Sequence, residues 1–310
     1  MLTVLQTALE VGLIYGLVAL ALFISFSILN IADLSTDGCF TLGCAVGAML
    51  TIAGHPILAL FAAMAAGMLS GYVTAFLQTR LGVESILAGI ISNTGLYTIN
   101  LAVMGFSSNV SITGVDTVFS LFKGLVGGQW SRLILLALIA AVIVIVLIRF
   151  FGTSLGLSIR ATGDSLDMVS ASSINPKFTI TIGLCLANAL TALSGCLIGE
   201  YNKFCDINLG TGMVTIALAS LIIGEVFAGH RGGVGKRIVC VVLGSIVYRF
   251  IIALALRLNI SAEYFKLVSA VIVAVAIAAP NMKGYVRLAK IKSNARRLRA
   301  LSGKGDETDA

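Results

Sequence analysis

Residues Gly156–Asn175, GLSIRATGDSLDMVSASSIN, form the longest stretch of the chain that is neither apolar nor at a terminus. They separate two apolar segments, Leu133–Phe150 and Phe178–Ile198, each long enough to cross the hydrocarbon core of a bilayer. Because irregular polar backbone cannot lie exposed to lipid, this insert has to lie outside the hydrocarbon.

The insert itself has helical spacing. Its apolar residues can share one side of a helix: Leu166, Val169 and Ile174, with Met168 beside them. Its charged residues fall on or near the other side: Arg160, Asp164 and Asp167. We therefore predict a short amphipathic helix parallel to the membrane, with Asp164 in its N-terminal turn and Asn175 and Pro176 at its end. An ordinary solvated loop is the alternative that the spacing leaves open.

The composition excludes a soluble globular domain. Hydrophobic residues make up 58% of the 310 residues and charged residues 11%, whereas about a quarter of a soluble domain is charged. The mean hydropathy is +1.03. We predict an all-α, polytopic transmembrane helical bundle of about nine spans, within a range of about eight to ten. The apolar segments are Leu5–Leu29, Cys39–Ala53, Ile57–Leu77, Ile86–Met104, Leu133–Phe150, Phe178–Ile198, Thr211–Phe227, Ile238–Leu256 and Tyr264–Ala279.

We assign residues 1–284 to this transmembrane domain and residues 285–310 to a basic, then polar, partly disordered cytoplasmic tail. Placing the insert and the tail on one side collects most lysines and arginines there, and the side richer in basic residues is cytoplasmic. Nine spans then put the N-terminus outside. This asymmetry explains the net charge of +7, so we expect membrane lipid and no nucleic acid as a partner.

The second apolar segment has a polar opening. Asn30–Gly38, NIADLSTDG, places Asp33 and Asp37 directly before a glycine-rich apolar run. Such groups are tolerated at membrane depth only where protein or a water-filled cavity covers them. We therefore predict that this crossing is a broken or partly unwound helix. If it is re-entrant instead, the chain has eight spans and the N-terminus lies inside.

Glycines recur at four-residue spacing, which lets helices approach closely. The pairs are Gly12 and Gly16, Gly43 and Gly47, and Gly67 and Gly71.

The residue patterns of catalytic and metal sites are missing. Six scattered cysteines form no C-x-x-C pair and there are two histidines, so we predict no metal, no catalytic site and no cofactor. Gly229–Arg237, GHRGGVGKR, looks at first like a phosphate-binding loop. It has His230 where glycine is required and Arg237 where Ser or Thr would hold magnesium. ATP is therefore not expected to bind this chain.

Polar residues inside the predicted spans are the candidates for a solute pathway: Asn93, Asn100, Asn188 and Arg249. A charge that faces lipid costs about 2.5–3.5 kcal/mol on insertion scales, so these residues should face the bundle interior or an aqueous path. For the asparagines, interhelical hydrogen bonding is the alternative. Arg249 either pairs internally, with Glu225 or a neighbouring subunit, or lines a cavity. Glu225 can instead pair with Arg231 or Lys236.

Three stretches resemble a known family: GLIYGLVALALFISFSILNIADLSTDG (residues 12–38), the insert, and Thr179–Glu200. They resemble the inner-membrane permease subunit of bacterial ABC importers of the branched-chain amino acid and ribose permease class, over the chain up to about Gly284. Within that class, NIADLSTDG and Ile216–Glu225, IALASLIIGE, look closest to permeases for aromatic amino acids such as tryptophan and tyrosine.

The resemblance implies partners and a contact site. Residues 160–175 would be the coupling helix that docks on a cytoplasmic ABC ATPase dimer. The contact residues would be Arg160, Ala161, Thr162, Gly163, Asp164, Asp167, Ser173 and Asn175. An extracytoplasmic binding protein would deliver the solute, and a second permease copy, in a homodimer rather than a heterodimer, would complete the pathway in the bacterial cytoplasmic membrane. Ser173 stands where related permeases usually carry glycine, which leaves the local turn undecided.

The expected function is that of the permease subunit of an ATP-driven importer of a small polar solute, an amino acid of aromatic type. The permease itself would catalyse no bond chemistry. The alternative is a carrier driven by an ion gradient, with Asp33, Asp37 or Glu225 as its coupling site. A membrane-embedded enzyme is a third possibility, which no G-x-S-x-G turn supports.

Overall fold

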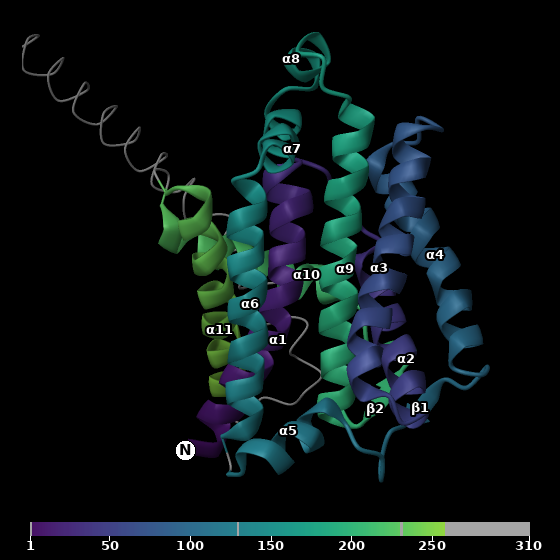
Figure 1. Cartoon of the computed structure of the whole chain (residues 1–310), viewed down its shortest axis with the longest axis vertical. Coiled ribbons are helices and arrows are strands. Elements are labelled where there is room, and N and C mark those ends of the chain that lie inside the picture. Colours follow the sequence, from purple (N-terminus) through teal and green to yellow (C-terminus); the bar gives the residue numbers. More distant parts are fainter. Residues whose placement is uncertain (1, 129, 230–231, 258–310) are drawn as a thin grey trace, which may run out of the picture.

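The computed structural model describes residues 2–128, 130–229 and 232–257, and this part of the chain is a helical bundle with a short β-ribbon (Figure 1). Its helices are α1 (Leu2–Leu22), the π-helical turn η1 (Phe23–Ile28), α2 (Thr36–Ile52), α3 (Pro56–Thr79), α4 (Ser85–Val103), α5 (Val118–Val126), α6 (Ser131–Phe151), α7 (Ser154–Asp164), α8 (Leu166–Ala171), α9 (Pro176–Asn202), α10 (Met213–Ala228) and α11 (Val234–Arg257). The strands β1 (Asn109–Ser111) and β2 (Phe204–Asp206) pair antiparallel, with Val110 opposite Cys205.

Six of the described helices are long and apolar enough to cross a membrane: α1 with η1, α3, α4, α6, α9 and α11. The apolar helices α2 and α10 are shorter, with 17 and 16 residues. The ninth predicted span, Tyr264–Ala279, and the predicted tail lie outside the described residues. The all-α membrane bundle is therefore confirmed, whereas the number of nine spans is not.

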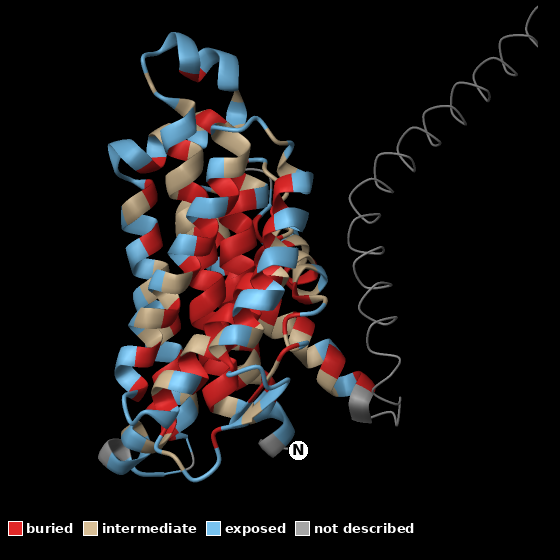
Figure 2. Cartoon of the chain, turned by 90° about the vertical axis from the view of Figure 1, so that its right-hand side faces the viewer, coloured by how far each residue is buried: buried red, intermediate tan, exposed pale blue. Residues whose placement is uncertain are grey.

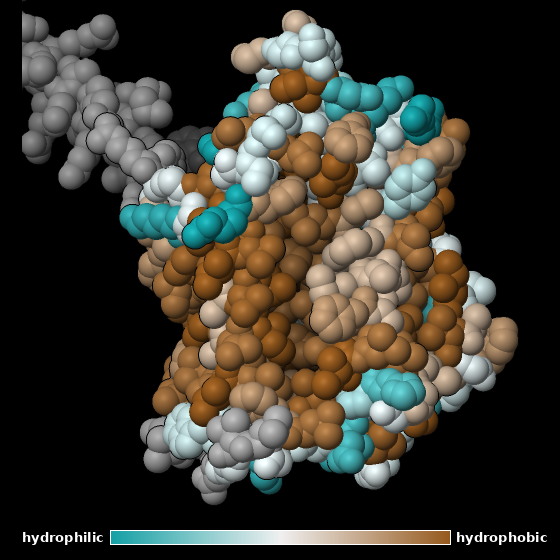
Figure 3. All heavy atoms as spheres, viewed as in Figure 1, coloured by the Kyte–Doolittle hydropathy of each residue, from teal (hydrophilic) through white to brown (hydrophobic). Residues whose placement is uncertain are grey.

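Helices α1 and α9 form the centre of the bundle. Most of their residues are buried, whereas only a minority of the residues of α4 and α6 are buried (Figure 2). The exposed side chains of the helices are largely apolar, and Figure 3 shows them covering the middle of one face, with polar residues towards its two ends. A bilayer requires such an apolar band between polar ends.

Glycines let α2 and α3 pack directly on α9. A Cβ atom on Gly43 of α2 would overlap the backbone of Ala192, and one on Gly67 of α3 would overlap the carbonyl of Asn188. Without side chains at these positions the helix backbones approach closely, as the four-residue spacing predicted.

The chain leaves helical geometry between η1 and α2. Residues 29–35 are not helical, and Asn30 has φ +56°. The Asp33 carboxylate accepts a hydrogen bond from the backbone N–H of Ser35 at 2.9 Å, a local bond that competes with helix formation. The predicted break is therefore present, but it precedes the second helix, and α2 runs unbroken from Thr36.

The polar insert folds as two helices, α7 and α8, at one end of the bundle (Figure 1). The prediction of a single helix was wrong, because Ser165 has extended backbone (φ −160°) and caps α8 by accepting from the N–H of Met168 at 3.3 Å. Asp164 is consequently the last residue of α7 and lies in no N-terminal turn, whereas Asp167 occupies the first turn of α8. Asn175 caps α9 instead of ending the insert helix.

The opposite end of the bundle carries the N-terminus, α5 and the β-ribbon (Figure 1). A buried carboxylate organises it: Glu200 of α9 accepts from the backbone N–H of Val118, at the start of α5, at 2.8 Å and from the hydroxyl of Thr51 of α2 at 3.1 Å. Glu200 thereby ties α2, α5 and α9 together.

Candidate functional site

The non-helical turn before α2 holds a buried carboxylate. Asp33 is 3% exposed, its Oδ1 accepts from the N–H and the hydroxyl of Ser35 at 2.9 and 2.6 Å, and its Oδ2 accepts from Asn188 Nδ2 at 2.8 Å. A carboxylate is tolerated away from water when its lone pairs are satisfied in this way. Asn188 is thus an interhelical tie that fixes the turn to α9.

Asp37 joins the starts of α2 and α10. It lies in the first turn of α2, and its two carboxylate oxygens accept from the N–H groups of Gly212 and Val214, both at 2.9 Å. One turn later, the hydroxyl of Thr41 accepts from the N–H of Gly210 at 3.1 Å. The positive ends of two helix dipoles therefore meet at one carboxylate inside the bundle.

A polar cavity of about 320 Å³, the Asp37 cavity, opens at this junction. Its walls come from α2, from one side of α4 and from the segment before α10: Asp37, Gly38, Thr41, Asn93, Thr94, Tyr97, Asn100, Ile207, Asn208 and Thr211. At 1.5 Å per residue, Asn93 and Asn100 lie about 12 and 22 Å along α4 from its start. The α4 wall of the cavity therefore lies within a helix long and apolar enough to cross a membrane, and discontinuous helices inside the membrane form the solute sites of many transporters.

Asn100 lines this cavity, and its amide oxygen is a hydrogen-bond acceptor without a partner in the described chain. Its side chain is 1% exposed, its Nδ2 donates to the carbonyl of Gly38 at 3.0 Å, and its Oδ1 has no hydrogen-bond partner in the described part of the chain. Asn93 approaches the same turn of α2, because a Cβ atom on Gly38 would lie 2.6 Å from Asn93 Oδ1. Of the four predicted pathway residues, these two share a cavity.

Arg249 lies apart from this cavity, on α11. Its guanidinium carbon is 3.7 Å from the centroid of the Tyr15 ring on α1. This cation–π contact offsets part of the cost of holding a charge in the bundle. Arg249 does not line the Asp37 cavity.

Glu225 has a different partner from those predicted. It pairs with Arg237 at 2.6 Å, not with Lys236 or Arg249, and Arg231 lies outside the described residues. Both side chains also hydrogen bond to Ser27 of η1. The cluster of Ser27, Glu225 and Arg237 thus joins η1, α10 and α11 near the α7–α8 end.

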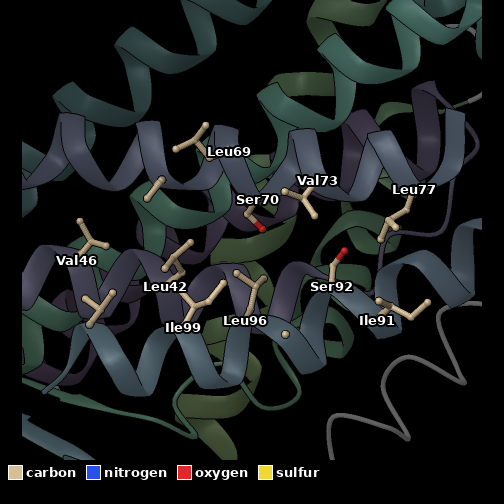
Figure 4. A pocket seen from close by; sticks show the side chains of 13 residues that line it. Leu42, Val46, Leu69, Ser70, Val73, Leu77, Ile91, Ser92, Leu96 and Ile99 are labelled. Atoms are coloured by element: carbon tan, nitrogen blue, oxygen red, sulfur yellow. The ribbon is translucent and has the colours of Figure 1, made fainter. Parts of the chain in front are cut away.

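A second, apolar cavity of about 540 Å³ lies between α2, α3 and α4 (Figure 4). Its walls are almost entirely aliphatic, with Ser70 and Ser92 as the hydroxyl-bearing residues. Ser92 shares a hydrogen bond with Thr74 at 2.8 Å. Since this cavity offers few groups to a polar solute, the Asp37 cavity is the candidate solute site.

The predicted partner contacts divide between two sides of the α7–α8 segment (residues 154–171). Two of them face the bundle: Thr162 Oγ1 hydrogen bonds to Thr179 Oγ1 of α9 at 2.8 Å, and a Cβ atom on Gly163 would overlap the carbonyl of Ile28. Ala161 is half-buried. The others are exposed, namely Arg160, Asp164, Asp167, Ser173 and Asn175.

The apolar residues of the α7–α8 segment also divide between a buried and an exposed side. Val169 is 2% exposed, whereas Leu166 and Met168 are 53% and 66% exposed at the tip of the structure. Ser173 has φ +61°, a left-handed conformation that glycine adopts most readily. The turn from α8 into α9 therefore explains why glycine suits this position.

Sequence reasoning singled out Asp33 and Asp37 but missed what they hold. Asp37 bonds to Gly212, which lies 175 positions away, and no local pattern connects the two. Tyr97 was missed although its signal was available: Asn93, Tyr97 and Asn100 follow one another at spacings of four and three residues and so mark one polar side of α4.

Comparisons with known proteins agree with this architecture. Residues 4–277 match the family described as the permease component of branched-chain amino acid transport systems. The chain is 32% identical to the tyrosine transport system permease protein of Clostridioides difficile (strain R20291), over 87% of this chain and 89% of that protein. It is 31% identical to the uncharacterized protein RP368 of Rickettsia prowazekii (strain Madrid E), over 88% of this chain and 96% of that one. No solved structure matches the chain. The chain therefore belongs to the family of branched-chain amino acid transport system permease components.

Proposed function

We propose that this chain is the membrane-spanning subunit of an ATP-driven (ABC) importer and forms the pathway for a small polar solute that an extracytoplasmic binding protein delivers. The proposal rests on the exposed surface of the α7–α8 segment. This segment stands at the end of the bundle and presents exposed charges beside the exposed apolar side chains of Leu166 and Met168. An apolar contact rimmed by charges is the surface by which a helix docks into a groove of a partner protein.

The same end of the bundle is the cytoplasmic one in this proposal, and the membrane is the bacterial cytoplasmic membrane. Arg80 follows α3, Arg149 lies in the last turn of α6, and Lys177 lies in the first turn of α9. Together with Arg160 they concentrate basic side chains at the α7–α8 end, as the positive-inside rule requires. A cytoplasmic ATPase dimer can then reach the exposed side of the segment.

The solute is an amino acid, of the aromatic type. This part of the proposal is supported by the relative that is named a tyrosine transport system permease protein. The Asp37 cavity supplies polar groups at membrane depth, where a zwitterion needs them.

A second copy of the chain completes the pathway. Thr94 and Tyr97 line the Asp37 cavity and are exposed on the side of α4 at membrane depth, with Tyr97 52% exposed. A polar cavity that opens towards lipid is unfavourable, and a second permease packed against this side would cover it. We favour a homodimer because the same surface is then available on both copies.

The contacts of the acidic residues do not favour an ion-gradient carrier. Asp33 is hydrogen bonded to Ser35 and Asn188, Asp37 holds the start of α10, and Glu225 is paired with Arg237. Each of these carboxylates holds together two segments of the described chain, a structural role that does not favour repeated binding and release of a coupling ion.

The test is reconstitution in proteoliposomes. The permease is combined with its partner ATPase and binding protein, and uptake of radiolabelled L-tyrosine is measured with and without ATP. We expect accumulation with all three components and ATP, and none with the permease alone. Uptake by the permease alone, abolished by an ionophore, would instead establish the ion-gradient carrier.

A further inference from the structure

The geometry points to the Asp37 cavity as a subsite for the primary ammonium group of the transported solute, with the unpaired Oδ1 of Asn100 as its central acceptor. This inference rests on the proposed function, because it names the part of the solute that the permease itself recognises.

The cavity wall carries several hydrogen-bond acceptors and one carboxylate. Asn100 Oδ1 is buried and unpaired in the described chain. A carboxylate has about four lone-pair sites, and the carboxylate of Asp37 accepts two backbone hydrogen bonds, from Gly212 and Val214. The amide oxygen of Asn93 lies close to the same turn of α2. Three side chains of the Asp37 cavity can therefore accept further hydrogen bonds.

Three of the side-chain donors around the cavity are already in use, and the others, on Asn93, Tyr97, Asn208 and Thr211, are neutral. Asn100 Nδ2 donates to Gly38, the hydroxyl of Thr41 donates to the carbonyl of Asp37 at 3.3 Å, and the hydroxyl of Thr94 donates to Ile90 at 2.9 Å. No lysine or arginine of the described chain lines the cavity. An entering carboxylate or phosphate would therefore meet Asp37 without a cation to pair with.

An ammonium group has the complementary chemistry, with three donors and no acceptor. Placed among Asn100, Asn93 and Asp37, the ammonium group donates a hydrogen bond to the buried oxygen of Asn100, whose unpaired state is unfavourable. Its positive charge also attracts the negative charge of the Asp37 carboxylate. The aromatic ring of Tyr97 also lines the cavity, and aromatic rings attract cations. A volume of about 320 Å³ is at the lower end of the range for ligand pockets, which suits the head group of a small solute.

The experiment uses the full chain in lipid nanodiscs with a reporter cysteine, Asn208→Cys, on the cavity wall. The rate of maleimide labelling is measured with two probes that share a hydroxyphenyl ring. Tyramine has the ammonium group and no carboxylate, whereas 3-(4-hydroxyphenyl)propionate has the carboxylate and no ammonium group. The wild-type chain, with its six native cysteines, gives the background rate.

We expect tyramine to slow labelling of the reporter and the propionate to leave it unchanged. At twice its Kd, tyramine leaves about a third of the cavities free, so labelling slows about threefold. Adding Asn100→Leu, which keeps the size and removes the acceptor, should abolish this protection. Ser92→Ala is the matched control, because Ser92 lies on the other side of α4 and lines the apolar cavity. It should retain the protection.

Four outcomes would overturn the inference: equal slowing by both probes, slowing by the propionate alone, no slowing by tyramine, or full protection in Asn100→Leu. If Asn100→Leu is not recovered as a monodisperse protein, Asn93→Leu takes its place with the same expectation. Tyrosine uptake by the complete wild-type importer tests the proposed function separately, since uptake can be present while tyramine fails to protect the reporter.

Discussion

Asp37 is the residue whose replacement tests the architecture of the candidate site most directly. Asp37→Ala removes a carboxylate that accepts from the N–H groups of Gly212 and Val214, both at 2.9 Å. A hydrogen bond to a charged group contributes about 1.5–3 kcal/mol, so the two bonds sum to about 3–6 kcal/mol. The adjoining cavity admits water to the freed N–H groups, which favours the lower end. We expect the free energy of unfolding to fall by about 3 kcal/mol.

Two further variants calibrate this value. Asp37→Asn keeps one acceptor oxygen and should cost about half as much, near 1.5 kcal/mol. The matched control is Asp206→Ala, which also removes a carboxylate bonded to a backbone N–H, that of Asn208 at 2.8 Å, but in a solvent-exposed hydrogen bond of the β-ribbon, where Asp206 itself is half-buried. It should cost less than about 1 kcal/mol.

The assay is equilibrium unfolding in mixed detergent micelles, with SDS as the denaturant and helix content followed by circular dichroism. Asp37→Ala should shift the midpoint well beyond Asp206→Ala. A loss for Asp37→Ala within about 0.5 kcal/mol of the wild type, the usual range of a surface substitution, would refute the idea that this carboxylate holds the starts of α2 and α10 together. Equal losses for the two alanine variants would refute it as well.

Three further predictions concern the α7–α8 end. Replacing the exposed charges Arg160, Asp164 and Asp167 together with alanine should lower transport-coupled ATP hydrolysis several-fold and leave elution on gel filtration unchanged; unchanged coupling would mean that the segment does not dock the ATPase. Glu225→Gln breaks a partly exposed ion pair and should lower stability by about 1 kcal/mol, and exchanging the charges as Glu225→Arg with Arg237→Glu should recover part of the loss in the same SDS titration. Ser173→Gly should raise stability by about 0.5–1 kcal/mol, because glycine relieves the left-handed backbone but adds entropy to the unfolded chain; a lower midpoint would contradict this.

The membrane bundle follows from sequence because a bilayer imposes one strong rule: a span needs about 20 apolar residues and bonds its own backbone. Leu133–Phe150 and Phe178–Ile198 obey that rule and lie within the helices Ser131–Phe151 and Pro176–Asn202. Helix ends depend instead on single side chains. Ser165 caps α8 and so divides the insert into two helices, a choice that helical periodicity does not encode.

The candidate site was only partly predictable for a related reason. Asn93 and Asn100 could be selected because a polar side chain in an apolar span needs an explanation. Which of the candidates meet depends on packing between distant segments. Asn188 donates a hydrogen bond to Asp33, and Arg249 contacts the ring of Tyr15, so two of the four candidates hold helices together. Hydropathy alone does not distinguish a tie between helices from a cavity wall.

A continuous set of contacts connects the α7–α8 segment with the Asp37 cavity. Gly163 of α7 packs directly on the carbonyl of Ile28, and Leu29 packs on Gly183 of α9. From there the chain runs through the turn at residues 29–35, tied to α9 by Asp33, into the first turn of α2, where Asp37 holds α10. Helices are stiff, whereas this turn is the one non-helical connection between α7 and the cavity along this described path. If an ATPase moves α7, the displacement therefore has to be taken up within residues 29–35 or passed to the N-terminus of α2, which lines the candidate solute site, and through Asp37 to α10.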